Sequence, residues 1–296
     1  MSAPQFHKAI RRQAKLRLGV CGPAGAGKTY SALEVAFGLG GKIALIDTES
    51  GSGELYAHLG EYDVCTLAPP FRVQDYISAI KTAEGAGYDV IILDSITHAW
   101  AGEGGLLEEH DRVSKRTGNS YTAWSEITPL HRQFVEAMLQ CKAHLIATMR
   151  SKTDYVLSQN DKGKLTPQKV GMAPIQRDGM DYEFTVVFDV DAAHTAAATK
   201  DRTSLFTGRI FTPSRETGVM LRDWLESGAA PAPVTQSAPT RTPAPEAPVG
   251  ERCEVCGGAL DLEYLPTIKE HTGGRSMCKA CFTQWWAAQS KKGVQA

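Results

Sequence analysis

The sequence predicts an α/β fold in which a mostly parallel sheet is covered by helices on both faces. Short apolar runs that indicate strands alternate with segments whose apolar residues recur at helical spacing. The run 88–94 (YDVIILD) is almost continuously apolar, as expected for a strand buried on both faces. A glycine-rich segment over 22–29 also lies between a predicted strand and a predicted helix.

The remaining elements follow in chain order from the same patterns. A strand over 16–21 leads into the glycine-rich segment, and a helix over 28–39 follows it. A long helix over 122–141 contains Pro129, where the helix either kinks or begins. The other expected helices cover 71–84 and 219–226, and the other strands cover 42–47, 62–67, 143–149, 182–191 and 202–211, the last as a strand or a hairpin.

A change in composition divides the chain. Residues 229–250 contain six Pro and six Ala and no large aromatic residue, so they cannot bury enough apolar surface to offset their ordering entropy. We interpret this stretch as a semi-extended linker. The expected organisation is a basic N-terminal segment (1–15), an α/β core (16–228), the linker (229–250) and a cysteine-containing module (251–296).

Composition excludes several classes of protein. The chain has 296 residues with 32 Lys and Arg against 33 Asp and Glu, so a globally basic nucleic-acid coat is excluded. No apolar run reaches the roughly 18 residues that a membrane span needs, and we expect a cytoplasmic protein without a membrane partner. The chain has seven cysteines, an odd number, and four of them form two Cys-x-x-Cys pairs, which is not the pattern of a secreted disulfide scaffold.

The strongest motif is the glycine-rich segment, which matches G-x-x-x-x-G-K-[ST]. Glycines let the backbone wrap a phosphate with N–H groups pointing inward at a helix N-terminus. Lys28 would supply charge to the β- and γ-phosphates of ATP, and the Thr29 hydroxyl would ligate Mg²⁺. A glycine-rich turn without a nucleotide is the alternative. Nucleotide contacts are expected from Gly22, Pro23, Ala24, Gly25, Ala26, Gly27, Lys28, Thr29 and Tyr30.

Two carboxylates complete the expected catalytic set. Asp94 ends the buried strand and would hold Mg²⁺ beside the phosphate loop, although a turn-capping Asp is the alternative. Ser95 follows it, so the group that activates water must come from elsewhere. Glu49, just past the strand over 42–47, is the candidate, and Lys28 and Asp94 join it as catalytic residues.

The order of phosphate loop, IDTE (46–49) and ILDS (92–95) resembles that of RecA-type recombinase ATPases. Over about 16–227 the chain resembles phage-encoded RecA-like ATPases that are grouped with single-strand annealing proteins and sometimes described only as AAA-family ATPases. The resemblance implies a RecA-like core, DNA-stimulated ATP hydrolysis, a homo-oligomer, and a role in phage recombination, annealing or repair inside an infected bacterial cell. It also implies that Glu49 is the catalytic carboxylate, where the alternative is a loop Glu without that role.

The sequence departs from that family after the strand over 143–149. The family has a polar sensor there, usually Gln or His, whereas this chain has Thr148, Met149 and Arg150. Thr148 and Arg150 are the sensor candidates, and Arg150 would sense the γ-phosphate or touch DNA. The basic residue that a neighbouring protomer would supply remains open among Lys152, Arg177 and Arg202.

In the family, the segments after the two middle strands line single-stranded DNA, and here they correspond to loops over 98–121 and 150–181. Residues 150–177 contain six basic and two acidic residues, a balance that suits sequence-independent binding of a single strand. A solvated loop or a β-hairpin arm is the alternative. The DNA candidates are Lys152, Tyr155, which would stack on a base, Lys162, Lys164, Lys169 and Arg177.

The N-terminus offers two further features. Residues 7–17 contain five Lys or Arg and no acid, and we expect a basic helix that lies on DNA or is simply solvated. Phe6 and Ala9 match the F-x-x-A segment through which archaeal and eukaryotic recombinases polymerise, so both are candidates for oligomerisation. A frayed terminus is the alternative.

The C-terminal module carries Cys253, Cys256, Cys278 and Cys281 as two Cys-x-x-Cys pairs separated by 21 residues, a spacing typical of a structural Zn²⁺ site. A redox pair would require a thioredoxin-like fold, for which the module is too short. We expect a zinc-ribbon or treble-clef arrangement that contacts DNA, a replication or recombination protein, or the ATPase core. Trp285 and Trp286 are expected to form its small core rather than a ligand platform.

Three functions remain open at this point. The favoured one is an ATPase that acts on single-stranded DNA. The second is a replication-accessory ATPase of the helicase-loader type, which recruits a partner through the zinc module and binds DNA weakly. The third is a nucleotide switch that binds ATP without hydrolysing it, against which Glu49 argues.

Overall fold

The computed structural model describes residues 6, 8–159, 165–229, 252–261 and 263–292. The chain divides into two compact units, Met1–Pro231 and Ala232–Ala296. Apart from Ala229, the expected linker lies outside the described residues.

The first unit is built on a nine-stranded sheet with the order β3-β2-β4-β5-β1-β7-β8-β9, and β6 pairs with β5. Along this order, six neighbouring strands are parallel: β3, β2, β4, β5, β1 and β7. Strands β6, β8 and β9 are antiparallel to their neighbours. The predicted α/β fold with a mostly parallel sheet is therefore confirmed. The strands are β1 (Arg17–Gly22), β2 (Ile43–Asp47), β3 (Asp63–Thr66), β4 (Val90–Asp94), β5 (His144–Gln159), β6 (Leu165–Pro174), β7 (Val186–Val190), β8 (Ala196–Asp201) and β9 (Ile210–Phe211).

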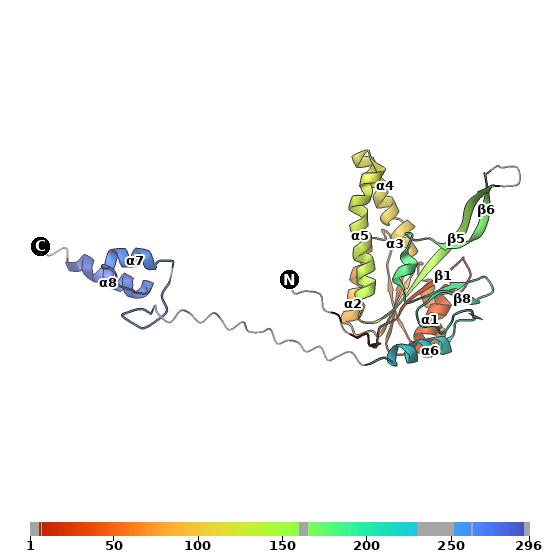
Figure 1. Ribbon diagram of the computed structural model, residues 1–296, viewed down its shortest axis with the longest axis horizontal. Helices are drawn as coiled ribbons and strands as arrows, with labels where there is room; N and C mark the ends of the chain where they lie inside the picture. Colours follow the sequence, from red (N-terminus) through yellow and green to blue (C-terminus); the bar gives the residue numbers. More distant parts are fainter. Residues whose placement is uncertain (1–5, 7, 160–164, 230–251, 262, 293–296) are drawn as a thin grey trace. The chain divides into compact units, whose positions relative to one another are not determined.

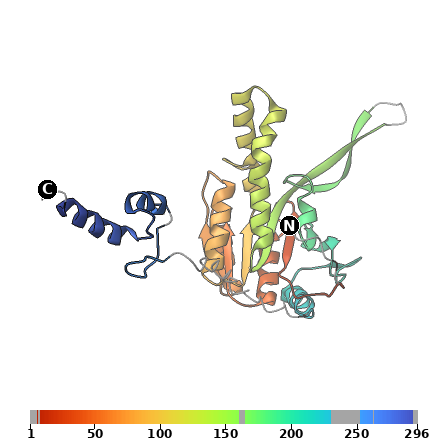
Figure 2. The same ribbon diagram turned by 60° about the vertical axis from the view of Figure 1, so that its left-hand side comes forward.

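Helices cover both faces of this sheet (Figures 1 and 2). Side chains alternate along the buried strands, so Leu45 and Ile92 face α1 (Lys28–Leu39) and α6 (Arg215–Glu226). Their neighbours Ile46 and Ile91 face α2 (Val73–Gly85) and α5 (Ser120–Gln140). Two apolar cores result, one on each side of the sheet. Pro129 lies inside α5 and does not begin it.

The contact between α1 and α6 depends on two glycines. A Cβ atom added to Gly38 would lie 1.9 Å from the carbonyl oxygen of Arg215, and one added to Gly218 would lie 2.2 Å from that of Val35. Both distances are far inside van der Waals contact, so the two helix backbones approach as closely as they do only because neither position carries a side chain.

The expected loop over 98–121 is wrong, because this segment is helical. It contains α3 (Thr97–Ala101) and α4 (Leu106–Thr117), and α4 packs along the start of α5. Leu106, His110 and Val113 are buried at helical spacing, and the His110 ring stacks on Trp124 with centroids 4.1 Å apart. Figures 1 and 2 show α4 and α5 side by side as a helical hairpin that projects beyond the sheet.

The loop expected over 150–181 is also wrong. The structure instead contains the β-hairpin arm that was the alternative. Strand β5 continues to Gln159 and pairs with β6 from Ser151↔Pro174 to Gln159↔Leu165. This β5–β6 arm extends away from the sheet (Figure 1). The short helix η2 (Met180–Glu183) then precedes β7.

Two other expectations change. The strand expected over 202–211 is reduced to β9, because the carboxylate of Asp201 accepts backbone N–H groups from Thr203, Ser204 and Phe206 and holds the preceding residues in a turn. The described residues 8–15 form no helix: Arg12 bridges to Ala229, and the Arg11 guanidinium lies 4.1 Å from the Trp224 ring. Part of the basic N-terminal segment therefore packs on the end of α6. The first unit also contains η1 (Ser52–Leu59).

The second unit contains α7 (Leu265–Thr272) and α8 (Lys279–Lys292). Its core is small, with Cys253, Ile268 and Met277 buried and Trp285 packed against them. Trp286, expected in this core as well, is 49% exposed, so the expectation for it is wrong. Among the described residues, no helix has both the length and the apolar character that crossing a membrane requires.

Candidate nucleotide and metal sites

The phosphate loop connects β1 to α1, and its shape depends on glycine. Gly25 and Gly27 have φ of +75° and +81°, a left-handed conformation that glycine adopts without steric cost. Ala26 between them is fully buried and anchors the loop. The Nζ atom of Lys28 folds back over the loop and donates to the carbonyl oxygen of Pro23 at 2.9 Å. Burial lowers the pKa of Lys28, and a phosphate bound beside this group would raise the pKa again by favouring the ammonium form.

Asp94 lies at the carboxyl end of β4, beside the start of α1. Its Oδ2 atom accepts a hydrogen bond from the Thr29 hydroxyl at 2.6 Å, and its Oδ1 atom accepts one from the Thr148 hydroxyl. The side chain is almost fully buried, and burial raises its pKa. A carboxylate and a hydroxyl are the hard oxygen ligands that Mg²⁺ prefers, so Thr29 and Asp94 fit that ion.

Glu49 lies in the turn after β2, and buried Asp47 shapes this turn. The Asp47 carboxylate accepts the backbone N–H groups of Glu49 and Gly51 at 2.6 and 2.7 Å. Arg150 donates two hydrogen bonds to the Glu49 carboxylate, one of them from Nε at 3.1 Å. Burial would raise the pKa of Glu49, but the hydrogen bonds and charge of Arg150 outweigh burial and lower it.

Three residues that the sequence analysis did not assign connect the ends of β2 and β4. The Thr48 hydroxyl accepts from the N–H of Ser95 at 2.8 Å and lies 2.8 Å from Nδ1 of His98. The Ser95 hydroxyl donates to Oε1 of Glu49 at 3.1 Å, and Nε2 of His98 lies 4.0 Å from the same oxygen. Thr48 directly precedes Glu49 in the sequence, and Ser95 directly follows Asp94, so both could have been found as neighbours of the two carboxylates. Nothing in the sequence pairs His98 with Glu49.

A cavity of about 530 Å³ begins at the phosphate loop and runs toward the start of α1 and η1. Its far wall includes Tyr30 and Tyr56, whose rings meet edge to face with centroids 6.2 Å apart. Neither Glu49 nor Asp94 lines this cavity. The remaining lining residues are Gly25, Gly27, Lys28, Thr29, Ser31, His194, Thr212 and Pro213.

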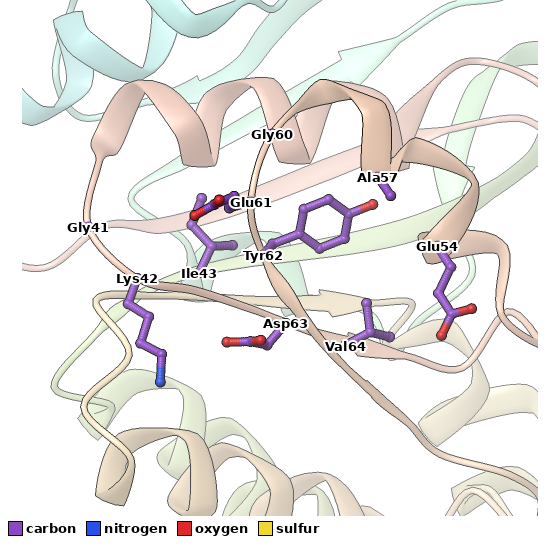
Figure 3. Close-up of a pocket in the computed structure, with 10 residues that line it drawn as sticks. All are labelled: Gly41, Lys42, Ile43, Glu54, Ala57, Gly60, Glu61, Tyr62, Asp63 and Val64. Atoms are coloured by element: carbon purple, nitrogen blue, oxygen red, sulfur yellow. The ribbon is translucent and has the colours of Figure 1, made fainter.

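A larger hollow of about 860 Å³ lies at the β3 edge of the sheet, shown in Figure 3. The carboxylates of Glu54, Glu61 and Asp63 line it, and Lys42 is the one basic residue there. This excess of negative charge repels a triphosphate, and no residue of the phosphate loop lines the hollow. The smaller cavity is therefore the better nucleotide site.

The root of the β5–β6 arm, where β5 leaves the sheet at Arg150 and the chain returns at Gln176, is hydrogen-bonded to the segment after Asp94. The N–H of Arg150 donates to the Thr97 hydroxyl at 2.9 Å. Buried Gln176, just past β6, donates from Nε2 to the carbonyl oxygen of Ile96 at 3.1 Å. Thr148 and Arg150, the sensor candidates, thus contact Asp94 and Glu49 respectively.

The DNA candidates lie at different places. Lys152 is exposed near the root of the arm, and Tyr155 pairs in register with Lys169 across the two strands. Arg177 lies away from the arm, donating to the Thr128 hydroxyl at 3.3 Å, with its guanidinium 5.7 Å from the Trp124 ring. Lys162 and Lys164 are outside the described residues. At the N-terminus, Phe6 and Ala9 are both exposed.

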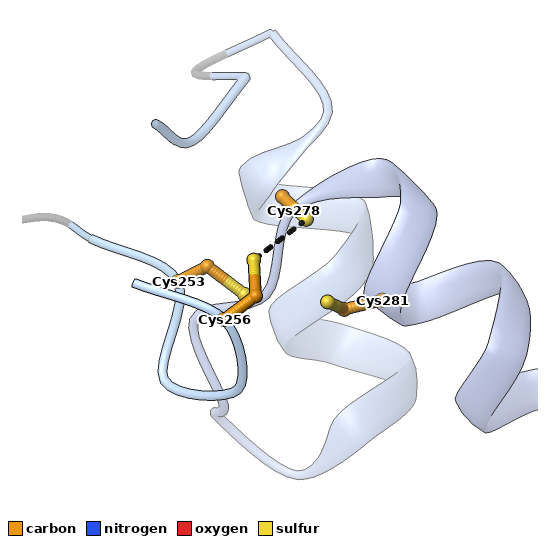
Figure 4. Close-up of side chains that lie close together, drawn as sticks. All are labelled: Cys253, Cys256, Cys278 and Cys281. Atoms are coloured by element: carbon orange, nitrogen blue, oxygen red, sulfur yellow. Dashed lines mark hydrogen bonds between the residues drawn. The ribbon is translucent and has the colours of Figure 1, made fainter. Parts of the chain in front are cut away.

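The four cysteines of the second unit converge, and Figure 4 shows their sulfur atoms turned toward a common centre. The four Sγ atoms all lie within 4.8 Å of one another, and those of Cys256 and Cys278 are 3.7 Å apart. A tetrahedral site with Zn–S bonds of about 2.3 Å has sulfur atoms about 3.8 Å apart, so the cluster fits Zn²⁺. Backbone N–H groups of Cys278 and Cys256 lower the pKa of Cys253 to about 6, which favours the thiolate that metals bind.

Comparison with known proteins identifies the larger unit. No curated protein matches the chain. The family model AAA_24, described as an AAA domain, matches residues 14–216, a range that contains the phosphate loop, Glu49, Asp94 and Arg150. An AAA domain supports ATP binding by the first unit. The chain therefore belongs to the AAA domain family of P-loop ATPases.

Proposed function

We propose that this protein is a Mg²⁺-dependent, RecA-type ATPase that acts on single-stranded DNA through its β5–β6 arm, in phage recombination, annealing or repair. One observation carries the proposal: β5 runs without a break from Thr148 and Arg150, at the nucleotide site, into the arm. A change at the nucleotide therefore has a direct mechanical route to the DNA-binding candidates.

The residues of the site divide the work of hydrolysis. Lys28 and the backbone N–H groups of the phosphate loop bind the phosphates of ATP, and Thr29 and Asp94 would hold Mg²⁺, which neutralises their charge. Glu49 orients a water molecule and accepts its proton. This role requires that Glu49 leave its ion pair with Arg150, because a carboxylate that already accepts two hydrogen bonds from a guanidinium is a poor base.

Arg150 would make that exchange in response to ATP. A γ-phosphate placed between Lys28 and Glu49 offers the guanidinium a more highly charged partner than the carboxylate does. If Arg150 turns to the phosphate, Glu49 is released, and the change reaches the arm because Arg150 is itself a residue of β5, which continues into the arm. Catalysis and the position of the arm are then coupled through a single residue.

The charge of the arm supports a nucleic-acid ligand. Residues 151–174, which contain both paired strands of the arm, carry four Lys against two Asp, an excess of two basic side chains in a chain whose formal net charge is −1. We further propose that protomers assemble through the segment that contains the exposed Phe6 and Ala9, as in the recombinases that the chain resembles.

Reversing the charge of basic residues on the arm should abolish most of the stimulation of ATP turnover by single-stranded DNA. We expect the double variant K152E/K169E to bind single-stranded DNA roughly tenfold more weakly and with a shallower salt dependence, because phosphate contacts are lost. Basal ATP turnover should persist, while its stimulation by DNA should fall. Steady-state turnover with and without a single-stranded oligonucleotide, at two salt concentrations, measures both effects.

The matched control is Lys81→Glu, which reverses the charge of an exposed lysine on α2, outside the arm. It should leave DNA stimulation unchanged. Turnover of the unaltered chain that is indifferent to DNA would refute the proposal and favour the accessory ATPase, with the second unit as the place where a partner binds.

A further inference from the structure

We propose that His194 recognises the sugar of the bound nucleotide by accepting a hydrogen bond from a ribose hydroxyl group. The site would then bind a ribonucleotide more tightly than an analogue that lacks this hydroxyl group. This inference rests on the proposed function, because it assigns a role within the same nucleotide site. No pattern in the sequence singles out His194, which lies about 165 residues beyond the phosphate loop.

The turn between β7 and β8 holds His194 rigidly. Both oxygens of the Asp191 carboxylate are occupied: Oδ1 accepts the N–H groups of Ala193 and Thr195 at 2.9 Å, and Oδ2 accepts the Thr195 hydroxyl at 2.8 Å. His194 itself has φ of +62°, in the left-handed region that residues with a side chain seldom adopt. Such a conformation is retained only where its surroundings compensate for the strain.

The conformation brings the imidazole onto the phosphate loop. Its Nδ1 atom lies 3.1 Å from the carbonyl oxygen of Ala26. A Cβ atom added to Gly27 would lie 3.1 Å from the same nitrogen, so the ring packs directly against the loop backbone. The ring therefore lies against the phosphate loop, and it also lines the cavity that begins there.

The partner of Nδ1 determines what the other ring nitrogen can bind. A carbonyl oxygen only accepts hydrogen bonds, so Nδ1 must carry the hydrogen, and in the neutral ring Nε2 then carries a lone pair. A lone pair repels phosphate oxygens, which have no hydrogen to donate, and accepts a hydrogen bond from a hydroxyl group. The ribose hydroxyl groups are the donors closest to the phosphates in a nucleotide.

The cavity places that hydroxyl within reach. His194 lines the cavity of about 530 Å³ together with Lys28, Thr29 and Tyr30, whereas Glu49 and Asp94 do not line it. The γ-phosphate belongs near the two carboxylate residues, so the nucleoside extends into this cavity from the opposite end of the phosphate chain. His194 lines this cavity next to the phosphate loop, between the phosphates and the nucleoside in this arrangement.

The test compares ADP with 2′-deoxy-ADP and 3′-deoxy-ADP, none of which is hydrolysed, by titration calorimetry of the full chain at mildly alkaline pH. We expect at least one deoxy analogue to bind about fivefold more weakly than ADP, the value of one neutral hydrogen bond. In His194→Asn this difference should disappear. Asn tolerates a positive φ, and its amide nitrogen occupies the position of Nδ1, so only the Nε2 acceptor is removed.

The outcomes separate the possible failures. Equal binding of all three nucleotides by the unaltered chain, or discrimination that survives in His194→Asn, would overturn the role of His194 while leaving nucleotide binding intact. If the unaltered chain bound no ADP, the proposed function itself would fail and this inference with it. Thermal unfolding of His194→Asn with a midpoint close to that of the unaltered chain would confirm that the loop contact is retained.

Discussion

Replacing Glu49 by Gln should lower ATP turnover by about a hundredfold to ten-thousandfold, the range expected for loss of a positioned general base. Gln has the same shape but cannot accept a proton from water. Because Lys28, Thr29 and Asp94 are unchanged, ATP binding should persist. Steady-state turnover and ATP affinity, measured on the same preparation, separate the two effects.

Two variants frame this result. Glu61→Gln removes an exposed carboxylate at the sheet edge and should leave turnover unchanged. Lys28→Ala should remove binding and turnover together, because it deletes the charge over the phosphate loop. If the unaltered chain hydrolysed ATP negligibly and Glu49→Gln changed nothing, the chain would be a nucleotide switch rather than an ATPase.

Removing the metal from the second unit should unfold that unit and spare the first. Among its described residues, the buried apolar side chains are those of Cys253, Leu265, Ile268 and Met277, and so small a core cannot offset the chain entropy of about 40 residues without a further constraint. We expect about one Zn²⁺ per chain by elemental analysis. Chelation should shift the emission of Trp285 and Trp286 and remove the helical signal of α7 and α8.

Substitution of a cluster cysteine gives the matched comparison. Cys281→Ser should bind zinc more weakly and show the same spectral changes without chelator. Cys65→Ser alters an exposed cysteine on β3, outside the cluster, and should bind zinc normally. A second unit that stays folded in chelator, with no metal by elemental analysis, would contradict a structural zinc site.

The sequence predicted those parts of the protein that local patterns encode. The apolar runs predicted the core strands, and their alternation with helices predicted the sheet. The G-x-x-x-x-G-K-[ST] spacing identified the phosphate loop because the loop is formed by eight consecutive residues. The convergence of the two Cys-x-x-Cys pairs was likewise predicted from spacing, and the sulfur atoms do cluster.

The remaining features depend on contacts between distant residues. Arg150 and Glu49 are 101 positions apart, and their pairing depends on the order of strands in the sheet. The resemblance predicts a loop over 98–121, whereas the spacing of Leu106, His110 and Val113 is that of the buried face of a helix. The contact of His194 with Ala26 requires a left-handed residue in a turn, which no periodicity encodes.

The order of strands in the sheet has a consequence for folding of the chain during its synthesis on the ribosome. The nucleotide site takes Lys28 from the start of α1, just after β1, Glu49 from the turn after β2, Asp94 from β4 and Arg150 from β5, and β5 lies between β1 and β4. Without β5, the phosphate loop and Asp94 have no strand to hold them in register. A nascent chain thus cannot assemble its ATP site until half of its length has been synthesised, and retention on immobilised ATP would report that β5 has joined the sheet rather than the mere presence of the motif.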